Sequence, residues 1–69
     1  MTTYAVALER TDNNYAADVP DLPGCVATGR TRKEVEGRIR EAIEFHLEGM
    51  REDGETPPRP TTSVATVEL

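Results

Sequence analysis

The chain has 69 residues and a mass of 7.6 kDa, enough for one small domain, and 36% of its residues are hydrophobic. No apolar stretch approaches the roughly 20 residues that cross a bilayer, and the single cysteine, Cys25, excludes an internal disulfide and suits a reducing cytoplasm. The net charge of −5 has the opposite sign to that of a protein that binds nucleic acid directly. We therefore expect a cytoplasmic protein with no membrane or nucleic-acid partner, whose charge suits a basic protein partner.

The first half of the chain has the pattern of three short strands. Apolar side chains occupy every second position over residues 3–9 and again over residues 15–19, and the Arg-Thr-Asp-Asn-Asn sequence at 10–14 is typical of a turn. These segments predict a β-hairpin. Two prolines and a glycine at 20–24 then interrupt the ladder, and a third strand is expected over 25–29.

A long amphipathic helix is expected to follow. Thr31 and Glu34 have the spacing of a capping box before a periodic stretch over residues 32–53, and Gly54 is placed to end the helix. The apolar face comprises Val35, Ile39, Ala42, Ile43, His46 and Met50, with Leu47 at its edge. This spacing predicts a helix that lies on one face of the sheet.

The last segment is expected to complete the sheet. Prolines make residues 55–62 an extended connector, and residues 63–69 alternate again, which predicts a fourth strand parallel to the first. The expected fold is α+β in two layers, with the order β-β-β-α-β. One helix would cover a mostly antiparallel four-stranded sheet, in a single domain over residues 1–69.

Several segments carry a resemblance to a known family. They are Tyr4-Ala-Val-Ala-Leu8, Tyr15-Ala-Ala-Asp-Val-Pro-Asp-Leu-Pro-Gly-Cys25, Ala27-Thr-Gly29, Thr31 with Glu34, and Glu41-Ala-Ile-Glu-Phe-His-Leu47. Together they resemble the HicB-family antitoxins. The resemblance implies a partial ribonuclease-H-like fold and the neutralisation of a small, basic HicA-type toxin that cleaves mRNA. Full-length members usually carry a C-terminal DNA-binding module, but here the chain stops at Leu69, so we expect no DNA-binding domain.

No residue pattern indicates catalysis. A nuclease of the ribonuclease-H type needs several convergent carboxylates to hold two metal ions, whereas Asp18, Asp21 and Glu68 are isolated in the pattern. His46 is the only histidine and lies on the apolar face of the helix without further metal ligands nearby, and Cys25 is expected to be a small buried side chain. We therefore expect no catalytic residues, no metal and no cofactor.

Acidic side chains are the candidate contacts for a basic partner. The set comprises Asp12, Asp18, Asp21, Glu41, Glu44 and Glu48. The simpler interpretation of the helical glutamates is a solvated face with pairs such as Glu34–Arg38 and Glu36–Arg40, and the alternative is a docking surface. Likewise, Pro20, Pro23 and Gly24 are explained as turn formers, although their loop could also bind a partner.

The second face of the sheet is a candidate surface for self-association. Ala5, Ala7 and Ala16 would lie on it beside Asp18, and one helix cannot cover both faces. We expect this face, or an edge strand beside it, to be buried in a homodimer or homotetramer. Two further functions stay open: a solitary HicB-like oligomer with a regulatory or structural role and no toxin partner, and an unusual nuclease that uses Asp18 or Glu68.

Overall fold

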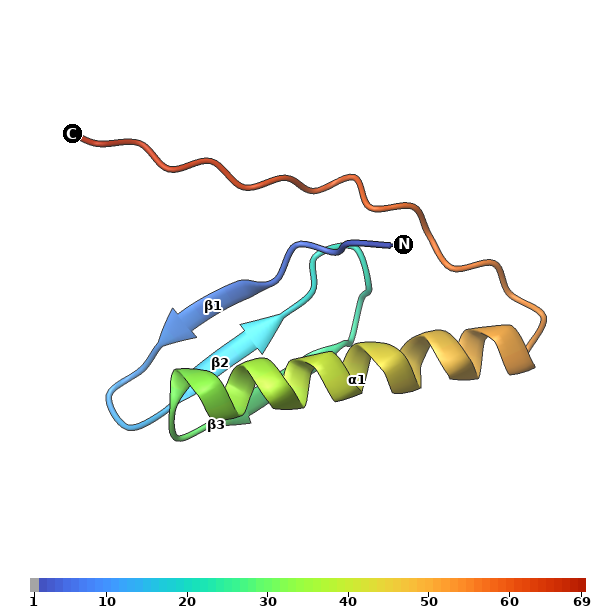
Figure 1. Ribbon diagram of the computed structural model, residues 1–69, viewed down its shortest axis with the longest axis horizontal. Helices are drawn as coiled ribbons and strands as arrows, with labels where there is room; N and C mark the ends of the chain where they lie inside the picture. Colours follow the sequence, from blue (N-terminus) through green and yellow to red (C-terminus); the bar gives the residue numbers. More distant parts are fainter. Residues whose placement is uncertain (1) are drawn as a thin grey trace.

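The structure is a three-stranded sheet with one long helix packed on one of its faces (Figure 1). The computed structural model describes residues 2–69, so Met1 of the expected domain lies outside the described residues. The elements are β1 (Ala7–Arg10), β2 (Tyr15–Asp18), β3 (Val26–Gly29) and α1 (Arg32–Glu52). The α+β class, the three antiparallel strands and the single helix agree with the prediction from the sequence.

The sheet has the order β1-β2-β3, and both pairings are antiparallel. Ala17 of β2 is the central residue, since it lies opposite Leu8 of β1 and Ala27 of β3. At the hairpin turn, the backbone N–H of Thr11 donates to the Asn14 carbonyl over 2.8 Å. Because side chains alternate along a strand, this register directs Leu8, Ala17 and Ala27 towards α1.

Backbone hydrogen bonds organise the loop between β2 and β3. The N–H of Val19 donates to the Cys25 carbonyl at 3.1 Å, and the N–H of Leu22 donates to the Val19 carbonyl at 3.0 Å. Gly24 has φ +84°, a left-handed conformation that favours glycine, and Pro20 and Pro23 lie within the same turn. The loop thereby places Leu22 in the core although it belongs to no regular element.

Side-chain and backbone caps define both ends of α1. The Thr31 hydroxyl accepts from the Glu34 N–H at 3.0 Å, while the Glu34 carboxylate accepts from the Arg30 N–H at 2.9 Å. At the other end Gly54 has φ +76°, and its N–H and that of Glu55 donate to carbonyls in the last turn of the helix. This is a Schellman arrangement, which satisfies helix carbonyls that would otherwise lack partners.

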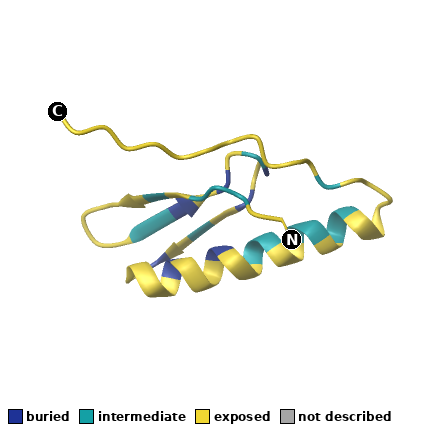
Figure 2. Cartoon of the chain, turned by 45° about the horizontal axis from the view of Figure 1, so that its top comes forward, coloured by how far each residue is buried: buried dark blue, intermediate teal, exposed yellow. Residues whose placement is uncertain are grey.

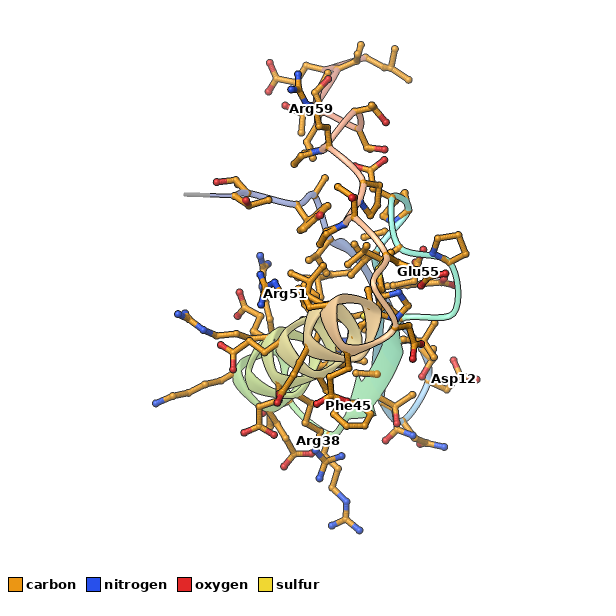
Figure 3. The ribbon with its side chains drawn as sticks, turned by 90° about the vertical axis from the view of Figure 1, so that its right-hand side faces the viewer. Asp12, Arg38, Phe45, Arg51, Glu55 and Arg59 are labelled. Atoms are coloured by element: carbon orange, nitrogen blue, oxygen red, sulfur yellow. The ribbon has the colours of Figure 1, made fainter. Side chains whose placement is uncertain are left out.

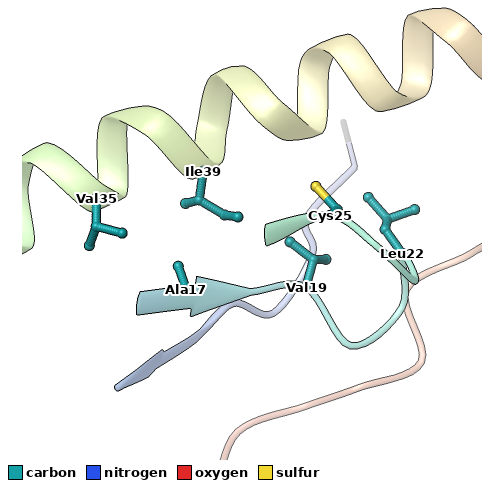
Figure 4. Close-up of a cluster of buried hydrophobic side chains, with 6 residues drawn as sticks. All are labelled: Ala17, Val19, Leu22, Cys25, Val35 and Ile39. Atoms are coloured by element: carbon teal, nitrogen blue, oxygen red, sulfur yellow. The ribbon is translucent and has the colours of Figure 1, made fainter. Parts of the chain in front are cut away.

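The core is small and lies between α1 and the sheet (Figure 4). Its buried side chains come from β2, the following loop and the first half of the helix: Ala17, Val19, Leu22, Cys25, Val35 and Ile39. Gly29 allows the close approach of β3 to the helix, because a Cβ atom at this position would lie 2.9 Å from the backbone nitrogen of Val35.

The expected fourth strand is wrong. Residues 63–69 pair with no strand of the described chain; they run as an extended, exposed segment past the sheet, which we call the tail (Figures 1 and 2). Tyr4 and Asp21 hold the preceding connector instead, because the Tyr4 hydroxyl donates to the Pro58 carbonyl at 2.6 Å and Asp21 binds Thr61 and Thr62. With the connector held in this way, the tail has no ladder partner among residues 2–69.

Candidate interaction surfaces

The predicted acidic contacts do not form one surface. Asp12 lies in the turn between β1 and β2, and Asp21 lies in the loop at the opposite end of β2. Asp18 is exposed and points away from the helix, because its neighbour Ala17 is buried beneath α1. Only the glutamates of the helix lie together, as described below.

Asp21 binds the chain's own connector. Its carboxylate accepts hydrogen bonds from the N–H groups of Thr61 and Thr62, at 3.0 and 3.1 Å, and from both threonine hydroxyls, each at 2.9 Å. The backbone N–H of Thr62 contributes most to holding the pKa of Asp21 below its ordinary value of 3.8, because these donors favour the charged carboxylate. The acidic group in the Pro20–Gly24 turn therefore has an internal partner.

The outer side of α1 carries the exposed acidic residues Glu41, Glu44 and Glu48. Their spacing of three and four residues places them on one side of the helix, away from Val35 and Ile39. Glu44 is 3.5 Å from Arg40 in an ion pair, whereas Glu41 and Glu48 have no ion pair within residues 2–69. Two uncompensated carboxylates therefore face solvent at the middle of the helix.

The ion pairs along α1 differ in part from the expected ones. Glu34 and Arg38 pair at 3.6 Å, as predicted, but the expected Glu36–Arg40 pair is wrong. Glu36 pairs with Arg32 at 3.8 Å, which leaves Arg40 to pair with Glu44. All of these side chains are at least partly exposed, so each pair contributes only a few tenths of a kcal/mol.

Phe45 is an apolar residue in this acidic surface that the sequence analysis did not single out. The residue is 79% exposed, and its side chain projects from α1 into solvent (Figure 3). It lies four residues after Glu41 and three before Glu48, so the two carboxylates flank it on the helix surface. The signal was available, because Phe45 is an aromatic residue outside the apolar stripe of the helix. An exposed aromatic ring among charges is a common anchor of protein–protein interfaces.

A shallow groove of about 520 Å³ runs beside Phe45, between the second half of α1 and the start of β3. Its lining includes Cys25, His46 and Met50. Cys25 is a free thiol, and desolvation by burial raises its pKa, so the thiol stays protonated and behaves as a small apolar side chain. His46 is half-buried at the edge of the groove. The groove thus extends the Phe45 surface towards β3, an edge strand.

The sheet face opposite α1 is uncovered. Ala7, Asp18 and Val26 form a row across its three strands, and the Val26 side chain is 64% exposed. Ala5 and Ala16, the other alanines expected on this face, are half-buried. Glu9 lies on the same face, opposite Ala16, so the face carries small side chains and two carboxylates, those of Glu9 and Asp18.

Metal centres and membrane-spanning helices are two further features that bear on function. Across residues 2–69, no three His, Cys, Asp or Glu side chains are grouped so that they could hold a metal ion. Asp18 lies at the end of β2 and Glu68 lies in the exposed tail. No helix in that range is both long and apolar enough to cross a membrane.

Comparisons with known proteins agree with the fold and the sequence motifs. A solved structure, that of TTHA0281 from Thermus thermophilus, superimposes with a TM-score of 0.71 and 40% sequence identity, over 77% of this chain and 68% of that one. A UPF0150 protein of Thermoplasma acidophilum, Ta0767, is 39% identical over 56 residues, which cover 81% of each chain.

The chain is also similar to a phage protein and matches the description of a known family. An uncharacterised 14.9 kDa protein of Haemophilus phage HP1 is 43% identical over 56 residues, and the chain covers 42% of its length. Residues 4–68 match the family described as HicB_like antitoxin of bacterial toxin-antitoxin system. This match spans all of the strands, the helix and nearly the whole tail. The chain therefore belongs to the HicB-like antitoxin family.

Proposed function

We propose that this protein is an antitoxin that neutralises a small, basic, mRNA-cleaving toxin of the HicA type by protein–protein contact. Membership of the HicB-like antitoxin family supports a protein partner such as a toxin. The net charge of −5 supports a basic partner, since opposite charges accelerate association and disfavour wrong partners.

The outer side of α1 around Phe45 is the docking surface in this proposal. The observation that carries it is the 79% exposed aromatic ring, flanked by Glu41 and Glu48, neither of which has an ion pair within residues 2–69. Aromatic side chains are enriched at the centres of interfaces, where a few desolvated residues contribute most of the binding energy, while surrounding charges steer the encounter. Glu44 is a weaker candidate, because Arg40 already pairs with it.

The proposed mechanism requires no chemistry by the antitoxin. A toxin that cleaves mRNA must bind RNA phosphates with basic side chains, and the carboxylates of Glu41 and Glu48 would occupy that basic surface in place of the phosphates. Phe45 would fill an apolar recess on the toxin and slow dissociation. Bound in this way, the antitoxin would block substrate access without itself cleaving anything.

Growth rescue tests this proposal. A small, basic candidate toxin of the HicA type from the same genome would be expressed in a host cell, alone and together with the wild-type chain, with Phe45→Ala, or with Val64→Ala. Val64 is a matched control, because it is also an exposed apolar residue, at 76%, but lies in the tail. We expect wild type and Val64→Ala to restore growth and Phe45→Ala to restore it poorly. Absence of rescue by the wild-type chain would contradict the antitoxin function and favour a solitary oligomer.

A further inference from the structure

The molecule exposes more surface than a compact protein of its size. Its accessible area is 5782 Å², whereas a folded monomer of 7.6 kDa is expected to expose about 4,300 Å². The radius of gyration is 13.1 Å, compared with about 11 Å for a compact chain of this length. The excess of about 1,500 Å² per chain is larger than the roughly 800 Å² that each partner contributes to a protein–protein interface of standard size.

The tail accounts for part of this excess. All residues from 63 to 69 are exposed, including Val64 at 76% and Val67 at 80%. The segment alternates, so that Ala65, Val67 and Leu69 would lie on one side of a strand, and it contains no proline or glycine. It has the sequence of a strand and an extended backbone, but no partner strand in the described chain.

Strand β1 of the sheet has an edge with no paired strand among residues 2–69. This strand lies at an edge and pairs only with β2. Between it and α1 lies a groove of about 670 Å³, which is larger and more apolar than the one beside Phe45. The apolar side chains of its lining are Tyr4, Val6, Leu8, Ile39, Ile43 and Leu47. An open strand edge beside an apolar groove can accept an added strand.

We propose that the tail of a second copy of this chain adds to the outer edge of β1, and that two copies exchange tails reciprocally. Ala65, Val67 and Leu69 of the incoming tail face the groove, and Thr66 and Glu68 face the opposite side. The backbone of the tail completes the hydrogen bonding of the β1 edge. The proposal does not depend on toxin binding, because the groove at β1 shares no lining residue with the groove beside Phe45.

Length and attachment support a partner copy as the occupant. Seven residues in a strand span about 23 Å, and the acceptor segment from Tyr4 to Arg10 also has seven residues. Within its own chain, Thr61 and Thr62 donate four hydrogen bonds to the Asp21 carboxylate, which hold them beside the β2–β3 loop, and the tail then leaves the surface. Reciprocal exchange uses the tail and the edge of both copies, so the assembly closes at two.

Light scattering and amide exchange on the full chain test this proposal together. Val67→Arg places a charge on the side of the tail that faces the groove, and Thr66→Arg places the same charge on its opposite side. Both residues are exposed in the single chain, so neither substitution should unfold it. Ala7→Arg is a third variant, which tests whether the uncovered sheet face forms the interface instead.

We expect the wild-type chain to have twice its mass of 7.6 kDa, and Val67→Arg to weaken association at least tenfold. Thr66→Arg and Ala7→Arg should remain dimeric. Amides of residues 63–69 should be protected from exchange in the wild-type dimer and unprotected in Val67→Arg. A monomeric wild-type chain, a Val67→Arg chain that dimerises like wild type, or unprotected tail amides would each overturn the proposal. So would a dimer that Ala7→Arg dissociates while Val67→Arg does not.

Discussion

The carboxylate of Asp21 accepts two hydrogen bonds from Thr62, one from the backbone N–H at 3.1 Å and one from the hydroxyl at 2.9 Å. The two residues are 41 positions apart, so this contact joins the β2–β3 loop to the connector that follows the helix. Thr61 binds the same carboxylate in the same way. The path of the last part of the chain therefore depends on this acidic side chain, together with the hydrogen bond from Tyr4 to the Pro58 carbonyl.

Removing this carboxylate should release the connector. In Asp21→Ala, we expect the amides of Thr61 and Thr62 to exchange faster than in wild type, because their acceptor is lost. The sheet and helix should keep their protection, since Asp21 lies outside the buried core. Asp12→Ala is the control, as Asp12 is exposed in the β1–β2 turn. Equal exchange of the two threonine amides in all three chains would contradict the contact.

The same contact has a predicted pH dependence. Because the pKa of Asp21 is lowered in the folded chain, its stabilisation is present above the ordinary value of 3.8 and is lost as pH falls through the lower folded pKa. NMR titration of the Thr61 and Thr62 amides should therefore show a midpoint below 3.8. A midpoint at or above that value would mean that the threonines do not bind the carboxylate.

Two glycines should respond to alanine in opposite directions. Gly29→Ala should lower the free energy of unfolding by about 1–3 kcal/mol, because the new Cβ would lie 2.9 Å from the Val35 nitrogen and 3.2 Å from its Cα. Gly37→Ala should raise it by about 1 kcal/mol, because alanine favours the helix and no heavy atom lies within 4 Å of the added Cβ. Urea unfolding measures both, and equal effects of the two substitutions would contradict the packing of β3 against the helix start.

Loss of the helix cap should destabilise the protein. Thr31→Ala removes the hydroxyl that accepts from the Glu34 N–H at 3.0 Å, and we expect a loss of about 1 kcal/mol in the free energy of unfolding. Thr66→Ala serves as the control, since Thr66 is exposed in the tail. If urea unfolding gives the same midpoint for Thr31→Ala and the control, the hydroxyl does not cap the helix in solution.

Local signals predicted the helix and its ends well. The helix begins at Thr31 and ends before Gly54. Both ends depend on contacts between residues that are close in sequence, so a short stretch of sequence is enough to predict them. The ion pairs were less predictable, because Arg40 has a glutamate four residues away on both sides and spacing alone cannot choose between Glu36 and Glu44. In the structure Glu36 forms an ion pair with Arg32, and Arg40 pairs with Glu44.

Non-local contacts account for what the sequence did not predict. The alternation over residues 63–69 indicates a strand, but whether a strand pairs depends on where its chain is held, here through Asp21 and Tyr4. The sequence placed Asp21 among the candidate contacts for a partner. Its hydrogen bonds with Thr61 and Thr62 could not be foreseen, because they join residues 40 or more positions apart. Phe45 could have been found from its position outside the apolar stripe of the helix.

The salt dependence of association tests the electrostatic part of the proposed function. Association with a basic toxin should slow steeply as salt is added, because screening weakens the attraction between exposed charges. Replacing both Glu41 and Glu48 with Gln should flatten this dependence, since neither carboxylate has an ion pair within residues 2–69. Stopped-flow mixing at several salt concentrations measures both effects. A rate that does not change with salt would point to an apolar interface instead.

Titration calorimetry of the purified toxin against this protein measures the proposed docking surface directly. We predict that the wild-type chain and Val64→Ala bind with equal affinity, and that Phe45→Ala binds at least tenfold more weakly while its melting temperature is unchanged, because the ring is 79% exposed in the free protein. Equal affinity of Phe45→Ala and wild type would contradict a docking surface on the outer side of α1.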